Sequence, residues 1–374
     1  MSQLSPGVYV LEQSTGARPI QSVGTSTAAF VGVAPKKTAH VDEAIGVANW
    51  TAFQATFGDK DRSTDLSDAV RGFFLNGGSY CYVLNIADPK KLVKTLEPDG
   101  ELDRIDEIAI VAAPGMATLA DWNALIGHCE RLGDRVAILD PPGKVKKLTE
   151  LTSVATAPDK PGGPPQSSYA AFYYPRLIVS DGRNQRTVAP SGFMAGAWAR
   201  TDAARGVHKA PANIGLGGVI GLEHSLSRSE QGLLNPKGIN VIRAFADRGI
   251  LVWGARTTDD AASEYRYLPV RRLMNQIKES IEEGTRWVVF EPNDETLWAS
   301  IRRDVSAYLR SQWRAGALQG ASESEAFFVQ CDAETNTPDD IAAGRVVVRI
   351  GVAPVKPAEF VIIRLQQIAG ESAA

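Results

Sequence analysis

The sequence lacks the residue patterns of several common chemistries. Its three cysteines, Cys81, Cys129 and Cys331, lie far apart, without the CxxC spacing of zinc or redox sites. We expect them to be reduced and mostly buried thiols. Its four histidines form no HExxH, HxH or Cys/His cluster, so we predict no metal site. No GxxxxGK[ST] motif occurs, which excludes a P-loop nucleotide hydrolase. We therefore predict no catalytic residue, no cofactor and no enzymatic activity.

The chain also lacks an excess of charge and any long apolar run. Its 40 basic and 43 acidic residues give a net charge of −3, which argues against a nucleic-acid partner. So small a charge leaves little self-repulsion and suits packing against copies of the same chain. No stretch of 18 apolar residues could cross a membrane. The first residues, 1–6, lack the features of a signal peptide, so we expect a protein made in the cytosol that does not insert into a membrane.

Hydrophobic patterning predicts a mixed α/β fold. The 374 residues suggest two or three domains. Ser63 and Thr118 are expected to cap helices that alternate with strands, an order typical of βαβ units and a partly parallel sheet. We expect central mixed β-sheets flanked by helices. The predicted strands are 25–33, 80–86, 108–112, 135–140, 239–244, 250–253 and 287–290, and the later helices are 271–283 and 294–315, the last capped by Asn293.

Three motifs resemble chemical sites but favour structural interpretations. Gly215–Gly221 is rich in glycine, yet Ile220 stands where a GxGxxG motif needs glycine, so we expect a tight loop. Ser191 lies outside any GxSxG context, and we expect it to cap a helix over 192–203 in which Gly192 and Gly196 allow close packing. Asp140 ends a strand, where it could serve either an active edge of the sheet or, as we favour, a turn.

Both chain ends carry strand-like segments without an obvious partner. The first is Val8–Leu11, which consists of Val8, Tyr9, Val10 and Leu11. A strand alone cannot offset an ordering cost of about 1–2 kcal/mol per residue, so it must join the main sheet or pair with another chain. Further strands are predicted over 345–352 and 359–368. The apolar residues of the last one are Phe360, Val361, Ile362, Ile363 and Leu365.

The predicted helix 294–315 carries arginines along one edge, at positions 302, 303, 310 and 314: Arg302, Arg303, Arg310 and Arg314. One interpretation is a solvated helix face. The other is a surface that presents positive charge to an acidic partner.

A series of short sequence segments, in this order along the chain, resembles the contractile tail sheath proteins of bacteriophages, R-type pyocins and phage-tail-like contractile injection systems. The most specific segments lie between Pro190 and Asn213 and in the final third of the chain. The segments are 5–9, 25–32, 76–83, 190–196, 199–202, 205–213, 234–240, 252–257, 270–272, 290–293, 297–298 and 353–360.

The resemblance implies a structural subunit that polymerises as stacked hexameric rings around an inner tube. It implies that terminal arms add strands to a neighbour's small sheet, and that the assembly contracts without ATP to drive the tube through a target envelope. The residues from Pro6 to Ser22 could span up to about 60 Å. By analogy, the helix with the four arginines would face the tube. Implied partners are further copies, the inner tube protein, and baseplate and tail-terminator or cap proteins, in a phage tail or phage-tail-like particle.

With this resemblance we divide the chain into four parts: an N-terminal arm (1–22), a body (23–238) with a variable insertion near 141–168, a C-terminal sheath domain (239–353) and a C-terminal arm (354–374). Two alternatives remain at this point, another phage-tail subunit of the tube or baseplate, and a doubly wound α/β enzyme. The sequence leaves open whether the particle is a phage, a pyocin or an injection system.

Overall fold

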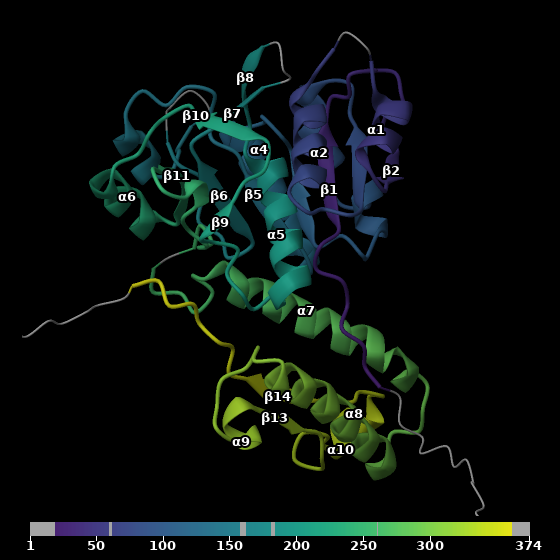
Figure 1. Cartoon of the computed structure of the whole chain (residues 1–374). Helices are drawn as coiled ribbons and strands as arrows, with labels where there is room; N and C mark the ends of the chain where they lie inside the picture. The colour runs from purple at the N-terminus through teal and green to yellow at the C-terminus, as the bar shows by residue number, and fades with distance from the viewer. Residues whose placement is uncertain (1–18, 60–61, 158–161, 181–183, 260, 361–374) are drawn as a thin grey trace, which may run out of the picture.

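The computed structural model describes residues 19–59, 62–157, 162–180, 184–259 and 261–360. Within these ranges, nine strands form one sheet, in the order β2-β3-β1-β4-β5-β6-β11-β12-β9. We call this sheet and its covering helices the body (Figure 1). The strands are β1 (Ala28–Gly32), β2 (Ala44–Val47), β3 (Cys81–Asn85), β4 (Ile110–Ala112), β5 (Val136–Leu139), β6 (Ala170–Tyr174), β9 (Ile214–Gly215), β11 (Ile239–Phe245) and β12 (Gly249–Val252).

The centre of the sheet is parallel. From β3 through β1, β4, β5 and β6 to β11, each neighbouring pair runs parallel. The edges are antiparallel, since β2 pairs with β3, and β12 pairs with both β11 and β9. The parallel strands are buried on both faces, as strands between two helical layers must be. The prediction of a mixed α/β fold with a partly parallel sheet is confirmed.

Helices cover both faces of this sheet and define two hydrophobic cores. On one face lie α1 (Trp50–Phe57), α2 (Asp65–Leu75) and α5 (Ser191–Arg205), packed against alternate strand residues such as Phe30. On the other lie α3 (Leu92–Thr95), α4 (Leu119–Leu132) and α6 (Arg228–Leu234). A second sheet, in the order β10-β7-β8, stands at the top of the view in Figure 1; its strands are β7 (Leu177–Ser180), β8 (Gln185–Val188) and β10 (Val219–Leu222).

A smaller unit, which we call the small lobe, lies below the body in Figure 1. It contains α8 (Glu295–Arg314), α9 (Glu323–Ala326), α10 (Pro338–Ala342), β13 (Phe327–Gln330) and β14 (Arg349–Val352). The long helix α7 (Leu268–Thr285) lies between body and lobe. Its Leu268 packs into the body core, while Leu273 and Ile277 pack into the core of the lobe. The boundaries of the four predicted parts remain a prediction, and the body sheet continues across residue 239 through β11 and β12.

Several sequence expectations are wrong in detail. Residues 287–290 form no strand: a short 3₁₀ turn covers Arg286–Val288, and Phe290 is fully exposed with φ at +71°. An apolar run predicts burial only when tertiary packing covers it, and here it connects α7 to α8. Thr64 and Asp294, rather than Ser63 and Asn293, accept the N-terminal backbone hydrogen bonds of α2 and α8.

Candidate assembly interface

The sheet of the small lobe has unoccupied edges in the described part of the chain. β13 and β14 pair antiparallel, with Phe327 opposite Val352 and Gln330 opposite Arg349, and no third described strand joins them. Phe328 remains 53% exposed on the outer face. A two-stranded sheet alone is marginally stable in water, and its free edge groups can pair with an added strand. The lobe therefore offers an acceptor for a further strand.

The N-terminal segment enters the fold between α7 and α8. Ile20 is buried directly over Gly284, where a Cβ atom would lie 2.6 Å from its side chain. The Val23 N–H donates to Ser280 Oγ (3.0 Å), and Gln312 Nε2 donates to Ser22 Oγ (2.9 Å). Gly284 lies one residue beyond the predicted end of the helix at 283, but the structure places it inside α7, where it makes room for the incoming chain. The predicted arm strand Val8–Leu11 lies outside the described residues.

The C-terminal segment leaves the lobe and returns to the body. Ala353 N–H donates to Ala326 O (2.9 Å), and Val355 N–H donates to Ala317 O (3.1 Å). Four residues later, Glu359 contacts Arg256 of the body. Phe360 is described, lies outside any strand and is 72% exposed. The other predicted arm residues, Val361, Ile362, Ile363 and Leu365, lie outside the described residues.

The four arginines of α8 differ in their surroundings. Arg302 donates to the carbonyl oxygen of Cys331. Arg310 forms a bidentate pair with Glu323, with two contacts of 2.8 Å. Arg303 Nε donates to Asp304 Oδ1 (3.0 Å), and Arg314 is exposed at the end of the helix. The basic edge thus exists, but part of its charge is compensated within the lobe.

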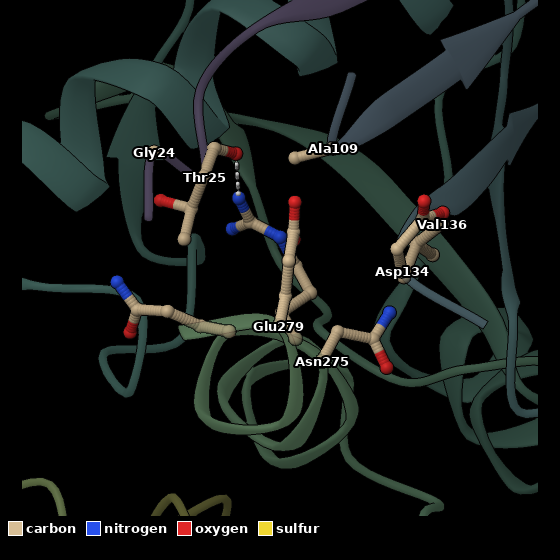
Figure 2. A pocket seen from close by; sticks show the side chains of 9 residues that line it. Gly24, Thr25, Ala109, Asp134, Val136, Asn275 and Glu279 are labelled. Carbon is tan, nitrogen blue, oxygen red and sulfur yellow. Dashed lines mark hydrogen bonds between the residues drawn. The ribbon is translucent and has the colours of Figure 1, made fainter. Parts of the chain in front are cut away.

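A buried ion pair joins the N-terminal segment to α5 and α7. Arg272 donates to Asp202 through two contacts of 2.5 and 3.0 Å, with both side chains at most 4% exposed. Thr25 Oγ1 donates to Asp202 (2.6 Å), and Arg272 donates to the Thr25 carbonyl oxygen (2.9 Å), the contact dashed in Figure 2. The guanidinium also stacks over Trp198. We call these residues the Arg272 hub.

Beside this hub lies a small cavity between the sheet and α7 (Figure 2). Its volume of about 10 Å³ is room for about one water molecule. Asp134 and Glu279 both line it. Burial, with the nearby carboxylates of Asp134 and Glu283, raises the pKa of Glu279 to about 7. This cavity offers no space for an organic substrate.

The motifs that resembled chemical sites have structural roles. Ser191 is the first residue of α5 rather than its cap; its Oγ and N–H both donate to buried Asp140 (2.7 and 2.9 Å). Asp140 also accepts from Gly115 N–H (3.1 Å), so it connects a strand end to the start of a helix. Burial raises the pKa of Asp140 to about 6, against the lowering effect of these donors.

The glycine-rich segment follows its structural expectation only in part, whereas the cysteines follow theirs. Gly217 exchanges hydrogen bonds with the Asn76 side chain (2.7 and 3.1 Å), so a tight turn exists at 216–218. The rest of the predicted loop is wrong, because Gly215 ends β9 and Val219–Leu222 form β10. All three cysteines are free and buried, and burial raises the pKa of each thiol. Among the described residues, no group of histidine, cysteine and carboxylate side chains could hold a metal ion. None of the described helices is long and apolar enough to cross a membrane.

Three features of this interface were not predicted from the sequence. The first is β13, although Phe327–Val329 is an apolar run of strand-forming residues. The others are the Arg256–Glu359 contact and the Asp202–Arg272 pair, whose residues lie in four of the segments that carry the family resemblance. Those segments include the four residues, but no sequence rule predicts that positions 70 or 103 residues apart will pair.

Family models and curated relatives agree on one protein class. The model described as the phage tail sheath protein central domain matches residues 102–258, and the phage tail sheath C-terminal domain matches 260–368. The tail sheath protein of Vibrio phage KVP40 is 31% identical over 48% of this chain and 26% of its own length. A putative prophage major tail sheath protein of Pseudomonas aeruginosa is 29% identical over 67% of this chain and 62% of its own. The chain thus spans between 26% and 62% of the length of these relatives.

Solved structures extend the similarity to the whole chain. The sheath complex of an extracellular contractile injection system, PVC, in its contracted state has a TM-score of 0.82 and 31% identity over 98% of both chains. The helical sheath of the anti-feeding prophage, also contracted, has a TM-score of 0.82 and 32% identity over 98% of this chain and all of its own. A sheath tail protein from Listeria innocua shares only the fold, with 11% identity and a TM-score of 0.59. The chain therefore belongs to the contractile tail sheath family, as a sheath subunit of the kind found in phage tails and contractile injection systems.

Proposed function

We propose that this sheath subunit polymerises with copies of itself as stacked six-subunit rings around an inner tube, and that the stack contracts without ATP to drive the tube through a target envelope. One observation carries the proposal: the β13–β14 sheet has no third described strand, and the described N-terminal and C-terminal segments both pass through the lobe that contains it. Whole-chain similarity to two contracted sheaths supports it. In this proposal the chain is not an enzyme.

Strand addition supplies the lateral contacts. The predicted donors are Val8–Leu11 at one end and the segment that begins at Phe360 at the other. The acceptor is the β13–β14 sheet of a neighbouring copy. Main-chain hydrogen bonds give such pairing its affinity, with little demand on side chains. The arms can therefore stay attached while the bodies slide and rotate past one another.

Contraction draws its free energy from packing. The extended stack is held in an arrangement that buries less surface than the contracted one. About 200 Å² of additional apolar burial per subunit releases about 5 kcal/mol, and hundreds of copies add these contributions. The change from the extended to the contracted arrangement begins at the baseplate and passes from ring to ring. The baseplate and a tail-terminator or cap protein are the further partners we propose. The subunit is made in the bacterial cytoplasm and joins a tail particle there.

The basic edge of α8 is the proposed contact with the inner tube. Because Arg302, Arg303 and Arg310 already bind groups of the lobe, the exposed Arg314 best suits this role. Arg314→Glu should weaken co-purification with the tube protein, since it reverses charge where an acidic partner would bind. Lys94→Glu, an exposed reversal on the body, is the matched control. Equal tube recovery from both variants would remove α8 from the proposal.

Deleting the N-terminal arm tests the polymerisation itself. The variant without residues 1–18 keeps Ile20 in its place over Gly284, so the fold should survive. Full-length protein should form wide cylinders in negative-stain micrographs, while the deleted chain stays small on size-exclusion chromatography. Two double-proline variants make a more specific test. One replaces Val8 and Val10 in the predicted strand, and the control replaces Gln13 and Thr15; each variant loses two backbone N–H donors. Cylinders at normal yield from the Val8/Val10 variant would show that this strand does not hold the polymer together.

A further inference from the structure

The last described residues of the chain form a short strap between the small lobe and the body. Residues 353–355 are bound to the lobe through Ala317, Gln319 and Ala326. Glu359 is bound to the body, so only three residues, Lys356–Ala358, cross between the two attachments. Pro357 restricts the backbone of this crossing. In Figure 1 the strap climbs from the lobe to the body, apart from α7.

The attachment at Glu359 is a dense, shielded contact. Arg256 donates to the carboxylate through Nη2 at 2.6 Å and through Nε at 3.0 and 3.2 Å. Asn235 Nδ2 donates to Glu359 Oε1 at 2.8 Å. The side chain of Arg256 is 8% exposed and that of Glu359 is 21% exposed. Charge-assisted bidentate pairs of low exposure are geometrically specific and weakly screened by salt.

Arg256 is itself held firmly by the body. Its Nη1 donates to the carbonyl oxygen of Asn235 (2.9 Å). Its backbone exchanges two hydrogen bonds, both 2.7 Å long, with the fully buried side chain of Asn240 on β11. The guanidinium therefore has one fixed position beside the large sheet. Glu359 binds this guanidinium, and the next residue, Phe360, is exposed.

We propose that Arg256, Asn235 and Glu359 form a clamp that fixes where the C-terminal arm leaves the body and locks the small lobe against the body. The lobe already contacts the body through α7 and through the N-terminal segment, whose Ile20 packs in the lobe core and whose Thr25 binds the Arg272 hub. The clamped strap is a further attachment along a separate path, and it adds resistance to rotation of the lobe. The clamp thereby aims the arm at a neighbouring copy and makes each subunit move as one unit. This inference rests on the proposed function of the arm.

The test compares Glu359→Gln with Asp340→Asn. Each replaces one carboxylate of an arginine pair by the isosteric amide, but the Arg345–Asp340 pair lies within the lobe, with its arginine 63% exposed. Spin labels at Lys94→Cys on the body and Ala343→Cys on the lobe report the distance between the two in unassembled protein. We expect Glu359→Gln to broaden this distance distribution and to raise the critical concentration for polymerisation about tenfold. Asp340→Asn should change neither.

A third chain, truncated after Phe360, separates this inference from the proposed function. It keeps the clamp but lacks the arm residues beyond Phe360, so it should show the narrow distance distribution and form no cylinders. Normal polymerisation of the truncated chain would overturn the arm proposal. If truncation abolishes cylinders while Glu359→Gln leaves both distance and critical concentration unchanged, the clamp is wrong and the arm proposal stands. Should Glu359→Gln fail to fold, Arg256→Lys decides by the same readouts, because it keeps the charge but loses the bidentate geometry.

Discussion

At the scale of single residues, the Arg272 hub is the buried ion pair among the contacts that hold the N-terminal segment to the rest of the fold. Its ion pair is almost fully buried and has charge-assisted partners on the backbone and side chain of Thr25. Asp202→Asn should lower the free energy of unfolding by about 3 kcal/mol, because it leaves the Arg272 guanidinium buried without a counter-charge. Urea unfolding monitored by tryptophan fluorescence measures this change. The exposed Lys91–Asp42 pair is the control, and Asp42→Asn should cost less than about 1 kcal/mol.

Glu279 gives the hub region a pH dependence. Since burial and neighbouring carboxylates raise its pKa to about 7, the folded state binds the proton more tightly than the unfolded state does. Its contribution to stability is complete below about pH 4.5 and is lost as the pH rises through about 7. Glu279→Gln should remove this loss and raise the free energy of unfolding at pH 8 by about 1 kcal/mol, after allowing for solvent screening. Thermal unfolding of both proteins at pH 5 and pH 8 measures it. If Glu279→Gln stabilised the protein equally at pH 5, the effect would not come from the titration of Glu279.

At the scale of secondary-structure elements, the contact between α2 and α5 depends on missing side chains. A Cβ atom at Gly192 would lie 2.2 Å from the Ala69 carbonyl oxygen, and one at Gly196 would lie 2.4 Å from that of Phe73. Backbone atoms cannot move aside as a flexible side chain can. Gly196→Ala should therefore destabilise the fold by about 2 kcal/mol, as overpacking does.

A matched control for this prediction lies in α4. Gly127 is exposed in the helix, and a Cβ atom there would meet nothing within 4 Å. Gly127→Ala should stabilise the protein by about 0.5–1 kcal/mol, because alanine is the better helix former. Changes of opposite sign in the free energy of unfolding, measured by chemical denaturation, would confirm that close packing causes the effect of Gly196→Ala. A stabilising Gly196→Ala would refute the close contact.

At the scale of the whole molecule, the proposed source of force is the packing of subunits rather than a bound nucleotide. Particles treated with apyrase should shorten on mild guanidinium exposure to the same length as particles supplied with ATP. Electron micrographs of sheath length before and after exposure measure this. Treated particles that stay extended until ATP returns would assign the work to nucleotide hydrolysis and contradict the proposal.

Local rules in the sequence determined most of the body. Alternation of apolar runs with capped helices predicted the parallel strands β1, β3, β4 and β5, since both signals act over a few residues. The Gly192 and Gly196 spacing predicted a close helix contact for the same reason. The family resemblance, carried by ordered segments over the whole chain, predicted the sheath class that the comparisons confirm.

Tertiary structure alone decided what depends on residues far apart in the chain. The apolar run 287–290 forms no strand: Trp287 and Val288 pack against the lobe core from a 3₁₀ turn, and no described residue covers Phe290. Arg302 and Arg310 are partly compensated because β13 and α9 bring Cys331 and Glu323 beside them. Glu359 meets Arg256 only after the chain has built the lobe and turned back to the body. A pattern in sequence records which groups are available, whereas their pairing depends on the path of the backbone between them.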